Sequence, residues 1–209
     1  MAIAINGSGT ITGISVGGLP NGIVDTDMLA NNAVTSAKAT GRGKILQVVQ
    51  TKVTAASTVT LTTGGTFYDI TPLNRTITPA SSSSKFLINA QIYGEADNED
   101  QEMHYRITST IGGSTNQQLA IADAGGSRTR VTGTWPPGYG GTDNASTPSV
   151  FFINNYLDSP GTASEITYQI FVSCQNSSKT FYLNRSVTDS DVWNFERGVS
   201  WLTVMEVAS

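Results

Sequence analysis

The stretch Ile166-Thr-Tyr-Gln-Ile-Phe-Val-Ser-Cys174 decides the fold class, because its apolar residues recur at every second position. Successive side chains of a β-strand point to opposite faces, so this period places Ile166, Tyr168 and Ile170 on one face and Gln169 on the other. Such alternation is typical of a strand in an antiparallel sheet with one face against a core.

The same period-two pattern occurs in three other stretches, Phe86–Tyr93, Met103–Thr108 and Val199–Val207. Further strands are expected at 45–52, 66–70, 119–122, 150–156 and 180–184, between segments rich in Gly, Pro, Asn and Ser. Eight or more short strands with no helical period between them predict an all-β fold. We expect an antiparallel β-sandwich, jelly-roll-like, over residues 44–209.

Several positions that we assign to the outward faces of these strands carry large apolar groups. They are Tyr93, Phe171, Leu202 and Val204. A single copy would expose them to water, and large exposed apolar patches mark interaction surfaces. We therefore expect a second buried face between subunits.

The first 40 residues contain no aromatic side chain and cannot build a core of their own. Alternating isoleucines on either side of Gly13 predict strands, and the run 17–22 predicts a turn. A short helix is expected from Met28 to about Thr40. Residues 1–43 are thus predicted to be a strand-plus-helix anchor that orders against other copies or a larger partner, with a flexible leader as the alternative. The expected anchor residues are Ile3, Ile5, Ile11, Ile14, Val16, Leu29 and Val34.

Composition argues against several classes of protein. Charged residues make up 13% of the chain, against about 25% in typical domains, and the net charge is −4, so nucleic acid is not an expected partner. The one cysteine, Cys174, excludes an internal disulfide and a cysteine-based zinc site. We also expect no signal peptide and no membrane insertion, because no apolar run approaches the length of a span.

No arrangement of residues predicts catalysis, a cofactor or a bound metal. The one histidine, His104, lies in a predicted strand, and the sequence places no nucleophile or orienting carboxylate beside it. The acidic cluster Glu95–Glu102 could offer oxygens to calcium, but its spacing is not that of an EF-hand, and solvated hairpin charge is the simpler interpretation.

Two loops are candidates for receptor contact. Gly133–Gly141 carries Trp135 and Tyr139, and Asp189–Arg197 carries Trp193 and Phe195. Rigid aromatic rings beside polar groups offer contact area at low entropic cost, as in carbohydrate and protein recognition. The alternative is that these rings fill the ends of the sandwich or a subunit interface.

The chain resembles a module of fibre and other virion proteins of marine and cyanobacterial-type tailed bacteriophages. The residues that carry the resemblance are 44–51, 67–70, 77–88, 182–186 and 198–207, with a leader resemblance at 6–20 and 24–29. The resemblance implies a homotrimeric virion appendage made in the host cytoplasm, with an N-terminal anchor on another virion protein and a C-terminal knob facing the host. It transfers no catalytic residue.

The expected function is therefore that of a trimeric tail fibre or appendage that binds a bacterial surface glycan or protein. A capsid fibre or decoration protein on the head is an alternative. A polysaccharide-degrading spike is a third, which would draw a carboxylate pair from Glu95, Asp97, Glu99 or Asp100, although the chain lacks the long repeats of a solenoid.

Overall fold

The structure is a computed structural model that describes residues 4–5, 11–12, 44–97, 103–134 and 148–209. The chain divides into two units, residues 1–41 and 42–209. In the first unit, β1 (Ala4–Ile5) pairs antiparallel with β2 (Ile11–Thr12), so Ile5 lies opposite Ile11. The helix expected after Met28 and the anchor residues Ile3, Ile14, Val16, Leu29 and Val34 lie outside the described residues.

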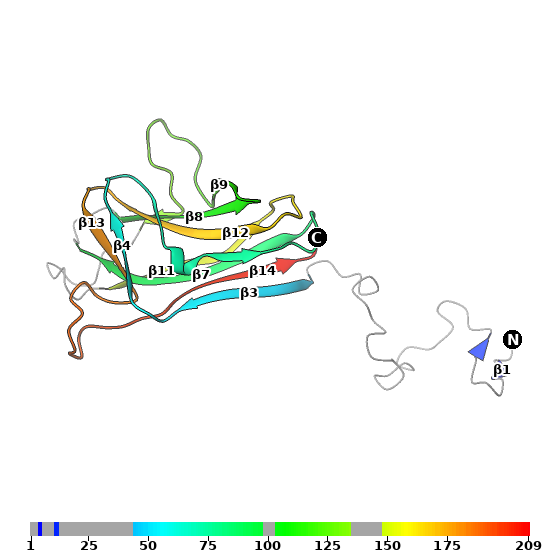
Figure 1. Ribbon diagram of the computed structural model, residues 1–209. Coiled ribbons are helices and arrows are strands. Elements are labelled where there is room, and N and C mark those ends of the chain that lie inside the picture. The colour runs from blue at the N-terminus through cyan, green and yellow to red at the C-terminus, as the bar shows by residue number, and fades with distance from the viewer. Residues whose placement is uncertain (1–3, 6–10, 13–43, 98–102, 135–147) are drawn as a thin grey trace. The chain divides into compact units, whose positions relative to one another are not determined.

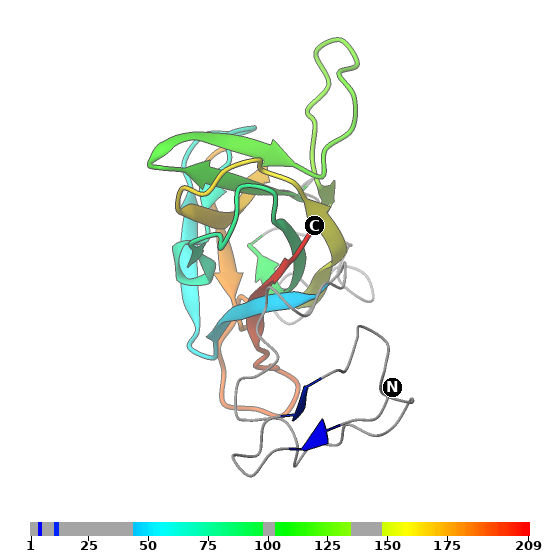
Figure 2. The ribbon, with the colours of Figure 1, turned by 90° about the vertical axis from the view of Figure 1, so that its right-hand side faces the viewer.

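The described residues of the second unit form a sandwich of two antiparallel sheets, which confirms the predicted fold class (Figures 1 and 2). The β7 sheet consists of β3 (Ile45–Val53), β4 (Ser57–Leu61), β7 (Lys85–Ala96), β11 (Ser149–Asp158), β13 (Lys179–Leu183) and β14 (Ser200–Val207). The β8 sheet consists of β5 (Tyr68–Asp69), β6 (Arg75–Ile77), β8 (Met103–Ile111), β9 (Ser114–Leu119), β10 (Gly133–Thr134) and β12 (Ile166–Cys174). A 3-10 turn, η2 (Thr71–Leu73), joins β5 to β6.

The core lies between the two sheets. From β12, Ile166, Tyr168 and Ile170 are fully buried, as their alternation predicts. From β7, Phe86 and Ile88 are equally buried, and the rings of Phe86 and Tyr168 lie 6.0 Å apart across the core. The two strands with the clearest period-two pattern thus supply opposite walls of the core.

The outward assignment of Leu202 and Val204 is wrong. Both side chains are fully buried, because β14 pairs with β7 so that Leu202 lies opposite Ala90 and Val204 opposite the inward Ile88. Both parities of β14 are apolar, and period alone therefore could not choose its inner face. Tyr93 and Phe171 are half-buried on the outer faces.

Most predicted strands exist with shifted ends, but the strand expected at 119–122 does not. Its segment contributes only Leu119, the last residue of β9, and the chain turns away at Ala120, whose φ of 49° is left-handed. The short strands β4, β6 and β10 were not predicted, since none carries a full alternating repeat.

In the β7 sheet, two neighbouring strand positions are each filled by two separate strands that lie in line, with a break between them. Along one edge of β7, β13 pairs with Gly94–Ala96 and β14 with Lys85–Gln91, so these two strands follow one another in line. Next to them β4 pairs with β13, and β3 pairs with β14. In Figure 1, β3 and β14 run along the lower layer, and β4 and β13 rise near one of its ends.

Glu206 is a buried carboxylate on the inner face of β14. Its oxygens accept hydrogen bonds from the Gln47 side chain of β3 and from the backbone N–H of Ala80, the latter at 2.7 Å. Burial raises the pKa of Glu206, but the nearby Ser84 hydroxyl and the hydrogen bonds from Gln47 and the 80–81 backbone outweigh burial and leave the pKa below its ordinary value.

This depressed pKa predicts acid sensitivity. The ionised Glu206 stabilises the fold above the unfolded-state pKa of about 4.3, and that contribution is lost as the pH falls through the lower native pKa. Glu206→Gln should therefore lower the free energy of unfolding at neutral pH, and its deficit against wild type should shrink on acidification. Urea unfolding between pH 7 and pH 3 measures this, with the exposed Glu165→Gln as control; a deficit that does not change with pH would contradict it.

A second stability prediction concerns Gly94, where β7 meets β13. A Cβ added there would collide with the backbone oxygen of Tyr182 and lie 2.6 Å from the Phe181 ring. Gly94→Ala should therefore cost about 1–3 kcal/mol of unfolding free energy, as overpacking does. In Gly125→Ala the added carbon meets only the flexible Arg128 side chain, at 3.3 Å, so thermal unfolding of that control should match wild type.

Candidate functional site: the loop between β13 and β14

The Trp193 loop, residues 184–198, leaves the β7 sheet after β13 and returns to the same edge at β14. Its two ends stay together, because Arg185 and Arg197 form an antiparallel bridge and the backbone N–H of Gly198 donates to the oxygen of Asn184 at 3.2 Å. A surface loop with closed ends is a common carrier of function on a rigid scaffold.

Asn184 fixes the start of the loop. It has a left-handed φ of 62° and is buried, with its backbone N–H donating to the oxygen of Tyr93 at 2.9 Å. Its side-chain amide donates to the backbone oxygens of Val53 (2.8 Å) and Ala55 (3.0 Å), in the gap between β3 and β4. Its side-chain oxygen accepts from Ser200 at 2.6 Å. One side chain therefore joins three interrupted strands.

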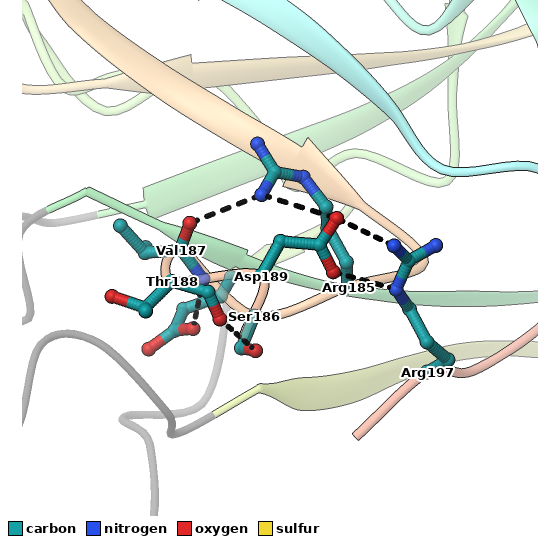
Figure 3. Close-up of polar contacts among 7 residues, drawn as sticks. Arg185, Ser186, Val187, Thr188, Asp189 and Arg197 are labelled. Atoms are coloured by element: carbon teal, nitrogen blue, oxygen red, sulfur yellow. Dashed lines mark hydrogen bonds and ion pairs between the residues drawn. The ribbon is translucent and has the colours of Figure 1, made fainter. Parts of the chain in front are cut away.

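Ion pairs brace the middle of the loop (Figure 3). Asp189 accepts two hydrogen bonds from the Arg197 guanidinium, at 2.7 and 2.5 Å, and lies 3.9 Å from Arg185. The Arg185 guanidinium also donates to the oxygen of Val187 and lies over the Tyr182 ring, 4.4 Å from its centroid. Bidentate arginine–carboxylate pairs fix orientation as well as distance.

Buried polar contacts hold the base of the loop. The backbone N–H of Val187 donates to Glu95 of β7 at 2.6 Å, and Ser186 donates to the oxygen of Thr188 at 2.8 Å. Both Glu95 and Ser186 are buried. Glu95, which the sequence places in an acidic cluster, thus contacts the base of the loop, and the cluster's residues 98–102 lie outside the described residues.

The tip of the loop presents Trp193 to solvent. Its side chain is 95% exposed, and its neighbours Asp191, Val192 and Asn194 are exposed as well. Phe195 is half-buried, and its backbone N–H donates to the oxygen of Val192 at 3.1 Å. Trp193 therefore does not fill an end of the sandwich within this chain. An indole ring on a braced loop, flanked by carboxylate and amide groups, can stack on a ligand and hydrogen-bond it.

The other predicted receptor residues, Trp135 and Tyr139, lie outside the described residues. The described residues that flank their segment are placed, however. Thr134 pairs with His104 at the start of β8, and Ser149 pairs with Gly94, one residue beyond the Tyr93 that binds Asn184.

Sequence reasoning named Trp193 and Phe195 as candidates but not the residues that position them. Asn184, Arg185 and Arg197 were not predicted as part of the site. The available signal was weak: an Asn directly after an apolar strand, and an Arg after a segment rich in Asp.

The described part of the chain shows no cluster of three or more His, Cys, Asp or Glu side chains placed to hold a metal ion. Within the same residues no helix has the length and apolar character needed to cross a membrane. His104 lies on the outer face of β8, opposite Ser173 of β12.

Comparison with known proteins gives matches among solved structures only. No family model matches the chain, and no curated protein matches its sequence. The structure of the infectious bursal disease virus Gx strain matches with a TM-score of 0.36 and 10% identity, over 81% of this chain and 38% of that one. Infectious bursal virus-derived T=1 particles match with a TM-score of 0.40 and 8% identity, over 79% and 37%. The chain thus spans less than half the length of these proteins.

The Asn184 junction makes a testable prediction. Asn184→Ala removes the donor to Val53 and Ala55 and places a non-glycine side chain without that compensation at positive φ, so it should cost about 2–4 kcal/mol. Trypsin should then cut more readily after Arg185 and Arg197, as limited digestion followed by mass spectrometry would show. The exposed Asn194→Ala should leave both stability and cleavage unchanged; equal cleavage in the two variants would contradict the role of Asn184.

Proposed function

We propose that this chain is a virion structural protein of a tailed bacteriophage, a homotrimeric tail fibre or tail appendage. Residues 1–43 join another virion protein, and the sandwich contacts a glycan or protein of the bacterial surface. The sequence resemblance to phage fibre proteins supports this proposal, and the described residues add one observation that favours surface attachment.

That observation is the position of the Trp193 loop. The strand pair β3 and β14 has Lys44 and Ala208 at one end, where the Ala208 N–H donates to the Lys44 oxygen at 2.8 Å. The loop leaves from the other end, where Ser200 lies opposite Val53. Figure 1 shows this loop, in orange, at the end of the lower layer away from the C-terminus. A chain tethered through Lys44 therefore presents Trp193 at the opposite end of the sheet from the tether.

The loop suits repeated weak binding. An interaction of millimolar affinity corresponds to about 4 kcal/mol, and several copies on one particle raise the overall affinity by roughly 10²–10⁴. The braces at Asp189 and Asn184 hold the loop before contact, so little conformational entropy is lost when Trp193 meets its ligand.

A capsid fibre or decoration protein remains the alternative, because it would use residues 1–43 in the same way. The location of the chain in the particle separates the two. Antibodies against the purified chain should label the tail of particles that contain it, at a copy number that is a multiple of three. Label over the head shell would favour the alternative.

Trp193→Ala should weaken binding of the labelled full chain to bacterial cells by tenfold or more, because the exposed ring supplies the contact area at the tip. Flow cytometry over a panel of strains measures this binding. If the receptor is a glycan, periodate treatment of the cells should abolish binding. If the receptor is a protein, protease treatment should abolish it. Glu165→Ala, an exposed change just before β12, is the control; a Trp193→Ala variant that binds as well as wild type would overturn the assignment of the loop.

A further inference from the structure

One outer surface of the sandwich differs from the rest. The apolar face is the outer side of the β7 sheet, made by the outward side chains of β11, β7, β14 and β3. Among the described residues, the exposed large apolar side chains on this face are Ile45, Val48, Val150, Phe152 and Leu157. Only Val192 and Trp193 of the Trp193 loop are comparably exposed elsewhere in that part of the chain.

Register arranges these side chains in rows across the sheet. Leu157 of β11 lies opposite Leu87 of β7, Leu87 opposite Met205 of β14, and Met205 opposite Val48 of β3. Four apolar side chains from four strands thus form one continuous row, which we call the apolar row.

A polar row lies beside the apolar row. In it Asn89 lies opposite Thr203 and Thr203 opposite Gln50, with the Gln50 amide donating to the Thr203 hydroxyl at 2.7 Å. Thr203 is buried, and the amides of Asn89 and Gln50 on either side of it both donate and accept hydrogen bonds, so this row can contact a second copy.

The outer side of the β8 sheet is different. Its outward positions on β8 and β12 include Arg106, Thr108, Thr110, Thr167 and Gln169, and Thr110 donates to Gln169 at 2.8 Å. Its apolar exception, Phe171, is half-buried. Among the described strand residues, the exposed large apolar side chains therefore lie on one of the two outer faces, as expected when only that face is covered.

We propose that the apolar face is the surface through which copies of this chain pack against one another. Its charged outward side chains are Lys52 and Lys85, each next to or at the end of its strand, and Glu95, which is buried where it accepts from the Val187 N–H, so packing two copies need not bury like charges at the centre. Four strands about 4.8 Å apart and eight residues long at about 3.4 Å each cover roughly 500 Å². That equals the share per partner of the roughly 1,000 Å² that a specific interface needs.

The proposed function includes self-association of the chain, and this inference assigns that self-association to one face. It does not depend on which receptor the chain binds. It also replaces the buried interface first expected from Leu202 and Val204, which are core residues. Assembly is tested by mass and attachment by cell binding, so either can fail without the other.

The full chain, analysed by light scattering after size exclusion, should have a mass of at least twice 22.1 kDa. Val48→Asn should weaken self-association at least tenfold and move the mass toward one copy, because a side chain buried between copies becomes polar. Val192→Asn is the matched control: Val48 is 55% exposed and Val192 51%, but Val192 lies on the Trp193 loop and should leave the mass unchanged. A wild-type chain of 22.1 kDa at all concentrations, or equal masses for the two variants, would overturn the proposal.

Thiol labelling gives a second readout that does not depend on weakening the assembly. Cys174 is buried, so a cysteine placed on the surface is the accessible thiol among the described positions. In the concentrated full chain, Leu157→Cys should react with a maleimide at least tenfold more slowly than Val192→Cys, although both native side chains are about half exposed in one copy. Dilution should remove the difference. Equal rates at high concentration would show that the apolar face is free.

Discussion

The shape of the β7 sheet depends on one constraint: two neighbouring strand positions are interrupted at the same level, and a single side chain connects the pieces. β3 and β4 follow one another in line, as do β14 and β13 beside them. The amide of Asn184 reaches the backbone oxygens of Val53 and Ala55, which lie at this interruption. Buried carbonyl groups need donors, so Asn184 allows the sheet to turn without leaving them unsatisfied.

The β8 sheet uses the same solution on a smaller scale. β9 and β10 both pair with β8, and residues 120–132 leave the sheet between them. The Thr132 hydroxyl closes this gap, because it accepts from the N–H of Ile107 and donates to the oxygen of Leu119. The chain departs at a left-handed residue in both sheets, Ala120 here and Asn184 there. Each loop therefore leaves the sheet where the backbone groups already have hydrogen-bond partners, and its tip can vary without disturbing the sandwich.

The sequence predicts those parts of the fold in which one parity of a strand is apolar and the other polar. β12 meets this condition, and its inner residues and both ends were predicted correctly. β14 does not, because Trp201 and Met205 on one parity are as apolar as Leu202 and Val204 on the other. Its inner face is set by pairing with β7, a contact between residues more than a hundred positions apart. The site follows the same division: an exposed Trp193 is visible in the sequence, but the contacts of Asn184 with β3 depend on register.

The apolar row and the Trp193 loop fit one assembly, because they use different parts of the same sheet. The apolar row crosses β11, β7, β14 and β3 toward the Lys44 end, where Ile45 lies opposite Val207. The loop leaves from the opposite end of β14, after Asn184. Copies that pack through the apolar row would bring their Lys44 residues near one another, since the row lies within a few residues of that end. The same packing leaves each Trp193 at the far end, so contacts that hold the copies together would not compete with contacts to a surface. An appendage that binds through several weak sites needs this separation, because its affinity depends on all copies binding at once.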